Sequence, residues 1–142
     1  MTAQTPANES AVLTPLISRA QLWTGRVISG FVALFLAWDG LMKLSKPAFV
    51  VKATLELGYP ESEIVGIGVV LLICTLLYVV PRTSILGAIF LTGYLGGAIA
   101  SQVRAQQSWF NVVFAFVFGC LVWVGLWLRN TRVRNFLPLH GH

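Results

Sequence analysis

The sequence predicts an all-α integral membrane protein: an up-down antiparallel four-helix bundle with a short interfacial helix between spans 1 and 2. Three observations support this fold class. Hydrophobic residues make up 56% of the chain and charged residues only 11%, whereas a soluble domain carries roughly a quarter charged residues. Four apolar segments each approach the ~20 residues that cross a bilayer. They use most of the 142 residues, which leaves no room for a separate soluble domain.

The membrane domain is predicted over residues 19–138, between two tails. Residues 1–18 contain no Lys or Arg and no apolar core long enough for a signal peptide. We therefore expect a disordered polar N-terminal tail that is retained, with the first span serving as the targeting signal. Residues 139–142 are expected to form a short C-terminal tail.

The first span is predicted over residues 22–44 and is not uniformly apolar. Arg26 lies near its start and can extend toward the headgroups. Asp39 and Lys43 lie near its end. If the helix is centred near Ala33, Asp39 is about 9 Å from the centre and inside a hydrocarbon half-thickness of ~15 Å.

The segment between the first two spans is too polar to cross a membrane and is predicted to be an interfacial helix. Ser45 is a candidate cap and Pro47 suits the first turn, whereas Gly58 and Pro60 end the helix. Apolar residues recur at helical spacing between these signals, at Phe49, Val50, Ala53 and Leu57.

The second and third spans are predicted over residues 64–80 and 83–103. Only Pro81 and Arg82 separate them, so they must form a tight antiparallel hairpin. Gly93 and Gly97 in the third span have a spacing that permits close helix contact. We expect this contact to lie inside the bundle, and the alternative is a seam between two copies of the chain.

The fourth span is predicted over residues 109–128 and has aromatic residues at both ends, as belts at the two membrane interfaces require. Six cations flank the spans on the side of the termini and four on the other side. This asymmetry favours cytoplasmic N- and C-termini in a bacterial cytoplasmic (inner) membrane. The Lys and Arg residues form no patch, which argues against nucleic-acid binding.

Several short segments resemble the DoxX-like family of small four-span membrane proteins, in the group that includes DoxD-type subunits. They are DGLMKL at 39–44, KP at 46–47, LGYP at 57–60, LLYVVPRT at 76–83, GYLGGA at 93–98 and Arg104. The resemblance covers residues 23–138 and implies a fold more than an activity. Some relatives are associated with membrane redox complexes, including thiosulfate-to-quinone electron transfer, and distant ones assist assembly of other membrane proteins. Related sequences often have His where this chain has Gln102.

Polar residues are predicted to gather on the side opposite the termini. Charge inside a membrane is costly and is a candidate functional site by default, although Asp39 and Lys43, four residues apart, can form a structural ion pair. As a hypothesis, Asp39 pairs with Lys43 or Arg104 and closes the polar end of a pocket. The candidates for a ligand site or an ion-pair network are Asp39, Lys43, Glu56, Tyr94, Gln102 and Arg104. Lys52 and Glu56 also suit the solvated face of the interfacial helix.

The remaining reactive residues give weaker signals. Cys74 and Cys120 are expected at similar depths, which permits a thiol pair, but two buried apolar residues are the commoner outcome. His140 and His142 lie outside every span, so no metal site is predicted. No set of catalytic residues can be assembled from the sequence.

Two functions remain open. The first is a non-catalytic module that binds a lipid-like or small apolar molecule, or a partner membrane protein. The second is a quinone-associated subunit of a redox complex, in which a partner carries the electrons. The sequence supplies no redox cofactor site of its own, which favours the first. The expected partners are the lipid bilayer and either another membrane protein or a second copy of the chain.

Overall fold

The computed structural model of the protein describes residues 18–137, and every regular element within them is helical. The predicted tails, Ser18 apart, lie outside this range. The elements are α1 (Arg19–Ser45), α2 (Ala48–Glu56), the short 3-10 helix η1 (Glu61–Glu63), α3 (Ile64–Val79), α4 (Ser84–Arg104), α5 (Trp109–Arg129) and α6 (Thr131–Phe136). Four of them, α1, α3 with η1, α4 and α5, are long and apolar enough to cross a membrane. The predicted fold class is confirmed.

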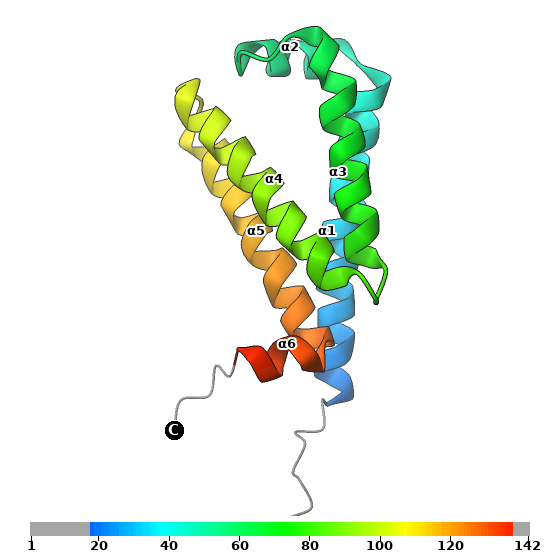
Figure 1. Ribbon diagram of the computed structural model, residues 1–142. Coiled ribbons are helices and arrows are strands. Elements are labelled where there is room, and N and C mark those ends of the chain that lie inside the picture. The colour runs from blue at the N-terminus through cyan, green and yellow to red at the C-terminus, as the bar shows by residue number, and fades with distance from the viewer. Residues whose placement is uncertain (1–17, 138–142) are drawn as a thin grey trace, which may run out of the picture.

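The four long helices form an up-down bundle. Helix α1 packs against α3 and α5, and α4 packs against the same two helices. Each helix runs antiparallel to the one before it, so α1 begins and α6 lies at one end of the bundle, while α2 covers the other end (Figure 1). Away from the α3–α4 hairpin, α4 leans away from α3, which leaves the bundle tight at the α6 end and wider at the α2 end (Figure 1).

Side-chain burial follows one stripe of each long helix. Val32, Leu71, Leu91 and Val122 are fully buried between the helices. The outward faces are also apolar, and Leu34, for example, is 74% exposed in the isolated bundle. An apolar outer surface of this kind is stable only against lipid.

A buried tyrosine holds the tight end of the bundle together. The Tyr78 hydroxyl donates to the Val122 carbonyl oxygen at 2.9 Å and lies 3.0 Å from the Ser29 hydroxyl. The Arg129 guanidinium donates to the Tyr78 carbonyl oxygen at 2.8 Å and covers its ring. One side chain therefore links α1, α3 and α5, because polar groups inside a membrane protein must find internal partners.

The helix ends differ from the prediction in ways that local hydrogen bonds explain. Helix α1 begins at Arg19, because Ser18 and Gln21 form a capping box before it. Ser45 does not cap α2 as predicted; it ends α1, and its hydroxyl donates to the Leu41 carbonyl oxygen. Lys46 then adopts a left-handed conformation, and α2 begins after Pro47. The short helix α6 was not predicted.

The tight helix contacts occur at other glycines than the predicted ones. A Cβ atom at Gly93 or Gly97 would meet no heavy atom within 4 Å, so the prediction of an internal seam there is corrected. Close contacts lie between α1 and α3, where Gly40 faces Gly68, and between α3 and α4, where Gly87 touches the Tyr78 backbone. Gly25 and Gly125 form further close contacts between α1 and α5. The reason is geometric: α4 diverges from α3 with distance from their hairpin (Figure 1), and Gly93 and Gly97 follow the start of α4 by nine and thirteen residues.

Candidate functional site: a cavity at the wide end of the bundle

A cavity of about 780 Å³ lies among the four long helices near α2. Its lining comes from α1, α3, α4 and α5, from Thr54 of α2, from Glu63 of η1 and from the segment that connects α2 to η1. We call this connecting segment, residues 57–60, the strap. The cavity exists because α4 and α5 lean away from α1 and α3 at this end, while the Tyr78 hydrogen bonds hold the helices together at the other end.

The wall between α1 and α5 is aromatic. The ring centroids of Phe35 and Phe118 are 4.6 Å apart, and those of Phe114 and Phe118 are 4.8 Å apart. Phe35 and Phe114 meet edge to face at 5.5 Å. Phe31 adds a further ring against Phe118 at 6.2 Å. These separations are typical of favourable aromatic contacts, so this wall is both apolar and well packed.

The wall between α3 and α4 contains three glycines and therefore few side-chain atoms. Gly66 of α3 and Gly93 and Gly97 of α4 line the cavity, and a Cβ atom at any of them would have no neighbour closer than 4.0 Å. Val70 also lines the cavity and is half exposed, and all three glycines are exposed. On this side, therefore, the cavity approaches the lipid-facing surface.

The polar end of the cavity contains the predicted ion pair. Lys43 Nζ lies 2.5 Å from Asp39 Oδ2, with the Lys43 side chain 18% and the Asp39 side chain 40% exposed. Tyr94 and Gln102 of α4 line the same cavity, as does Glu63, the last residue of η1. Gln102 Oε1 is buried and has no hydrogen-bond partner among residues 18–137. An acceptor in this state favours a ligand that can donate to it.

The strap closes the cavity at the α2 end through two contacts with α4. The Tyr59 hydroxyl lies 2.7 Å from the Ser101 hydroxyl, which itself donates to the Gly97 carbonyl oxygen. The Arg104 guanidinium donates to the Leu57 carbonyl oxygen at 2.9 Å. Gly58 has a φ of +85°, a conformation that side chains other than glycine rarely adopt. The strap thus ties α2 to α4 across the mouth of the cavity.

The structure brings together four of the six predicted candidates. Asp39, Lys43, Tyr94 and Gln102 line the cavity, and Asp39 pairs with Lys43 rather than with Arg104. Arg104 instead holds the strap. Glu56 does not face the cavity.

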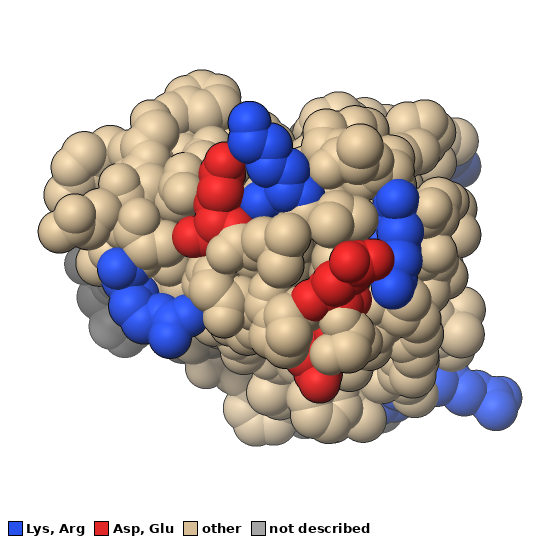
Figure 2. All heavy atoms as spheres, turned by 90° about the horizontal axis from the view of Figure 1, so that it is seen from above, with Lys and Arg blue, Asp and Glu red and all other residues tan. Residues whose placement is uncertain are grey.

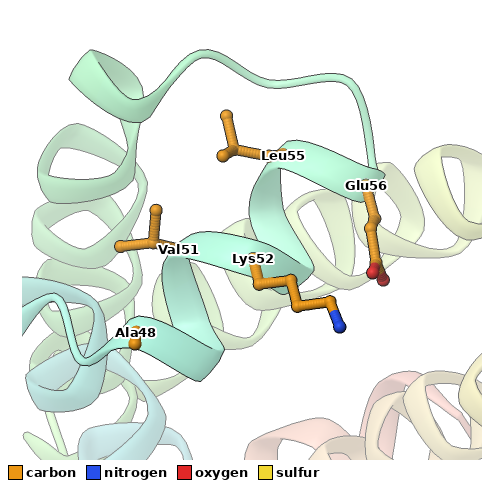
Figure 3. Close-up of a pocket in the computed structure, with 5 residues that line it drawn as sticks. All are labelled: Ala48, Val51, Lys52, Leu55 and Glu56. Carbon is orange, nitrogen blue, oxygen red and sulfur yellow. The ribbon is translucent and has the colours of Figure 1, made fainter.

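Glu56 and Lys52 project to the same side of α2 at its outer surface, beside a shallow apolar hollow (Figure 3). Ala48, Val51 and Leu55 complete this hollow. Because α2 alone lines it, it has no opposing wall and cannot enclose a ligand.

Charge is distributed unequally between the two ends. Viewed from the α2 end, acidic and basic side chains alternate across the surface (Figure 2). Every acidic residue that the structure describes belongs to this half of the bundle: Asp39, Glu56, Glu61 and Glu63. A second ion pair, Lys46 with Glu61 at 3.8 Å, also occurs there. The α6 end carries arginines without acidic partners among the described residues: Arg19, Arg26, Arg82, Arg129, Arg132 and Arg134.

The thiols do not form a pair. Both cysteines are free, with Cys74 buried in α3 and Cys120 exposed on α5. The expected similarity of depth does not bring them together, because α3 and α5 each pack against α1 and α4 rather than against each other. Between residues 18 and 137, no three His, Cys, Asp or Glu side chains gather in a group that could hold a metal ion.

Sequence reasoning missed the aromatic wall, the strap contacts and the cavity position of Glu63. Phe114 and Phe118 are four residues apart and so share one helix face, a signal that was present in the sequence. The partnership of Tyr59 with Ser101 had no comparable signal, because the two residues are 42 positions apart.

Comparison with known families supports the architecture. The model of the DoxX-like family matches residues 27–125, which include all of α2 and α3, all of α4 and most of α1 and α5. Comparisons with curated proteins and with solved structures gave no match. Four helices of spanning length together with the family match fit an integral, multi-pass membrane protein, and the chain belongs to the DoxX-like family.

Proposed function

We propose that this protein is a non-catalytic membrane module that binds one amphipathic, lipid-like molecule in the cavity at the α2 end. The observation that carries the proposal is the cavity itself, which joins an aromatic wall to a polar end. Its volume of about 780 Å³ falls within the ~300–1,000 Å³ of typical ligand pockets.

The two parts of the cavity suit the two parts of an amphiphile. An apolar chain can lie along the rings of Phe35, Phe114 and Phe118, where burial of apolar surface contributes about 25 cal/mol per Å². A polar head can reach the Asp39–Lys43 pair and donate a hydrogen bond to Gln102 Oε1. Binding of this kind requires shape and hydrogen bonds but no reacting group, so we assign no catalytic residue.

The test uses a cavity-filling variant and a matched control on the same helix. Ala98 lines the cavity, whereas Ala100 is exposed on α4 and does not. Purified protein is extracted with organic solvent, and co-purifying molecules are quantified by mass spectrometry. We expect an amphiphile in stoichiometric amount with the wild type and with Ala100→Trp, and its loss with Ala98→Trp. Equal retention by both variants would contradict binding in this cavity.

A quinone is the alternative ligand, in a membrane subunit whose redox partner carries the electrons. The aromatic wall favours this alternative, because Phe35 and Phe118 present rings against which a quinone can stack. The same solvent extract discriminates the two. A bound quinone has a characteristic ultraviolet absorption that changes on reduction, whereas a phospholipid or fatty acid does not absorb there.

We place the protein in a bacterial cytoplasmic membrane with both termini in the cytoplasm. The arginines at the α6 end support this orientation, because positively charged segments remain on the cytoplasmic side. A membrane protein partner or a second copy of the chain could dock on the apolar outer faces of the bundle. The cavity would then lie in the half of the bundle farther from the cytoplasm.

A further inference from the structure

We infer that the amphiphile enters the cavity sideways from the bilayer, through an opening between α3 and α4 that Gly66, Gly93 and Gly97 form. We call these three residues the glycine portal. This inference rests on the proposed function and adds the source of the ligand: a molecule that resides in the membrane rather than one dissolved in water.

The other seams between the long helices are closed beside the cavity. The α1–α5 seam is filled by the rings of Phe35 and Phe118. The α1–α3 seam is closed by direct contact of Gly40 with Gly68. At the α4–α5 seam, a Cβ atom at Gly119 of α5 would lie 3.9 Å from Leu95 Cδ1 of α4, and Leu95 itself lines the cavity.

The α3–α4 seam is closed only near the hairpin. There Gly87 of α4 touches the backbone of Tyr78. Farther along, Gly93 and Gly97 are exposed, line the cavity and have no neighbouring heavy atom within 4 Å of a Cβ position. Both positions carry only a hydrogen atom instead of a side chain, and the two helices separate toward the α2 end (Figure 1). A larger residue at either glycine would project into the opening.

The depth of the portal indicates where the ligand comes from. Gly97 precedes Arg104, the polar end of α4, by seven residues, or about 10 Å of helix, and Gly93 precedes it by about 16 Å. These depths correspond to the acyl-chain region of a bilayer, whose half-thickness is ~15 Å. The route from the aqueous side is covered instead by the strap, through its contacts with Ser101 and Arg104. The open route therefore leads to lipid.

The experiment uses a phosphatidylcholine with a photoactivatable diazirine in the middle of one acyl chain. The protein is reconstituted with this probe in vesicles of phosphatidylethanolamine and phosphatidylglycerol, irradiated, and digested for mass spectrometry. Two residues of α5 report on the two locations: Phe118 lines the cavity and is 5% exposed, whereas Phe116 faces outward and is 62% exposed. The ratio of label on Phe118 to label on Phe116 measures entry and carries its own internal reference.

Three leucine substitutions on α4 test the route. Gly93→Leu and Gly97→Leu place a side chain in the portal, and Gly96→Leu is the control because Gly96 is equally open but does not line the cavity. None of the three meets a neighbour within 4 Å of its Cβ position, and leucine favours helix more than glycine does. We expect a several-fold fall of the Phe118 to Phe116 ratio in the two portal variants and no change in Gly96→Leu.

Each outcome has a distinct meaning. If the wild type shows no label on Phe118, the proposed function fails together with the portal. If the wild type is labelled there and both portal variants match it, the portal is overturned while binding in the cavity stands. An equal fall in Gly96→Leu would also overturn the portal, because the effect would not depend on the cavity wall. Unchanged labelling of Phe116 and an unchanged elution volume establish that each variant is folded.

Discussion

The Asp39–Lys43 ion pair carries most of the charge inside the cavity, and each partner lowers the free-energy cost of burying the other. Asp39→Asn would leave the ammonium group of Lys43, which is only 18% exposed, without its carboxylate. Because the pair is only partly buried, we expect a loss of about 1 kcal/mol of stability. Thermal unfolding in detergent measures this loss.

A double variant separates the pair from other effects of the substitution. Asp39→Asn combined with Lys43→Gln removes both charges and should recover most of the lost stability. If the double variant unfolds at the same temperature as Asp39→Asn alone, the two charges do not stabilise each other.

Tyr78 offers a second prediction, because its hydroxyl is bonded on two sides. Tyr78→Phe leaves the Val122 carbonyl oxygen and the Ser29 hydroxyl without their partner in a fully buried position. We expect a loss of about 1–2 kcal/mol, measured by thermal unfolding. Tyr94→Phe is the matched control, since the Tyr94 hydroxyl makes no hydrogen bond within residues 18–137. Equal losses for the two variants would contradict a structural role of the Tyr78 hydroxyl.

Pairings between residues of one helix were predictable from the sequence, whereas pairings between different segments were not. Asp39 and Lys43 are one helical turn apart, so their pairing follows from helix geometry alone. Arg104 was an equally plausible partner for Asp39, but it binds the Leu57 carbonyl oxygen. That choice depends on the path of the strap, which residue spacing does not encode.

At the scale of the helices, two glycines of α4 have opposite roles. A Cβ atom at Gly87 would overlap the backbone of Tyr78, so Gly87→Ala must push α3 and α4 apart. We expect a cost of about 3 kcal/mol or more. Gly96→Ala adds a Cβ in open space and should be neutral or stabilising by up to about 1 kcal/mol. Thermal unfolding of both variants checks this difference. An unfolding temperature of Gly87→Ala equal to that of the wild type would contradict the prediction.

The strap yields a prediction about local rather than global stability. Arg104→Met and Tyr59→Phe together remove both side-chain contacts between the strap and α4. We expect faster amide hydrogen exchange in residues 48–60 with unchanged exchange in α3 and α5, because α2 has few other contacts with the bundle. Lys52→Met is the control, since Lys52 projects from the outer surface of α2 (Figure 3). Unchanged exchange in the double variant would show that the strap is held by other means.

The helices themselves were predictable because hydrophobic length determines a span. The four predicted ranges agree with the observed helices to within a few residues. The short connection at Pro81 and Arg82 forces α3 and α4 to be antiparallel neighbours. The seam at Gly93 and Gly97 was not predictable. Small-residue spacing permits close contact, but whether a neighbour is present depends on how α4 leans relative to α3, which it touches closely at Gly87 and Tyr78.

For the whole molecule, the distribution of charge predicts an orientation in the membrane. The α6 end carries arginines alone among the described residues, whereas acidic side chains accompany the cations of the α2 end (Figure 2). Cations near the ends of spans are retained in the cytoplasm, so α6 and the α3–α4 hairpin should lie inside and α2 outside. The cavity would then face the outer half of the membrane.

Single-cysteine labelling tests this orientation. In a background in which Cys74 and Cys120 are replaced by Ala, Lys52→Cys reports on α2 and Arg82→Cys reports on the hairpin; both positions are exposed. A membrane-impermeant maleimide added to intact spheroplasts should label position 52, and it should label position 82 only after the membrane is permeabilised. The reverse pattern would place the termini outside. The cavity would then lie in the cytoplasmic half of the bilayer, and an amphiphile entering through the glycine portal would come from the inner leaflet instead of the outer one.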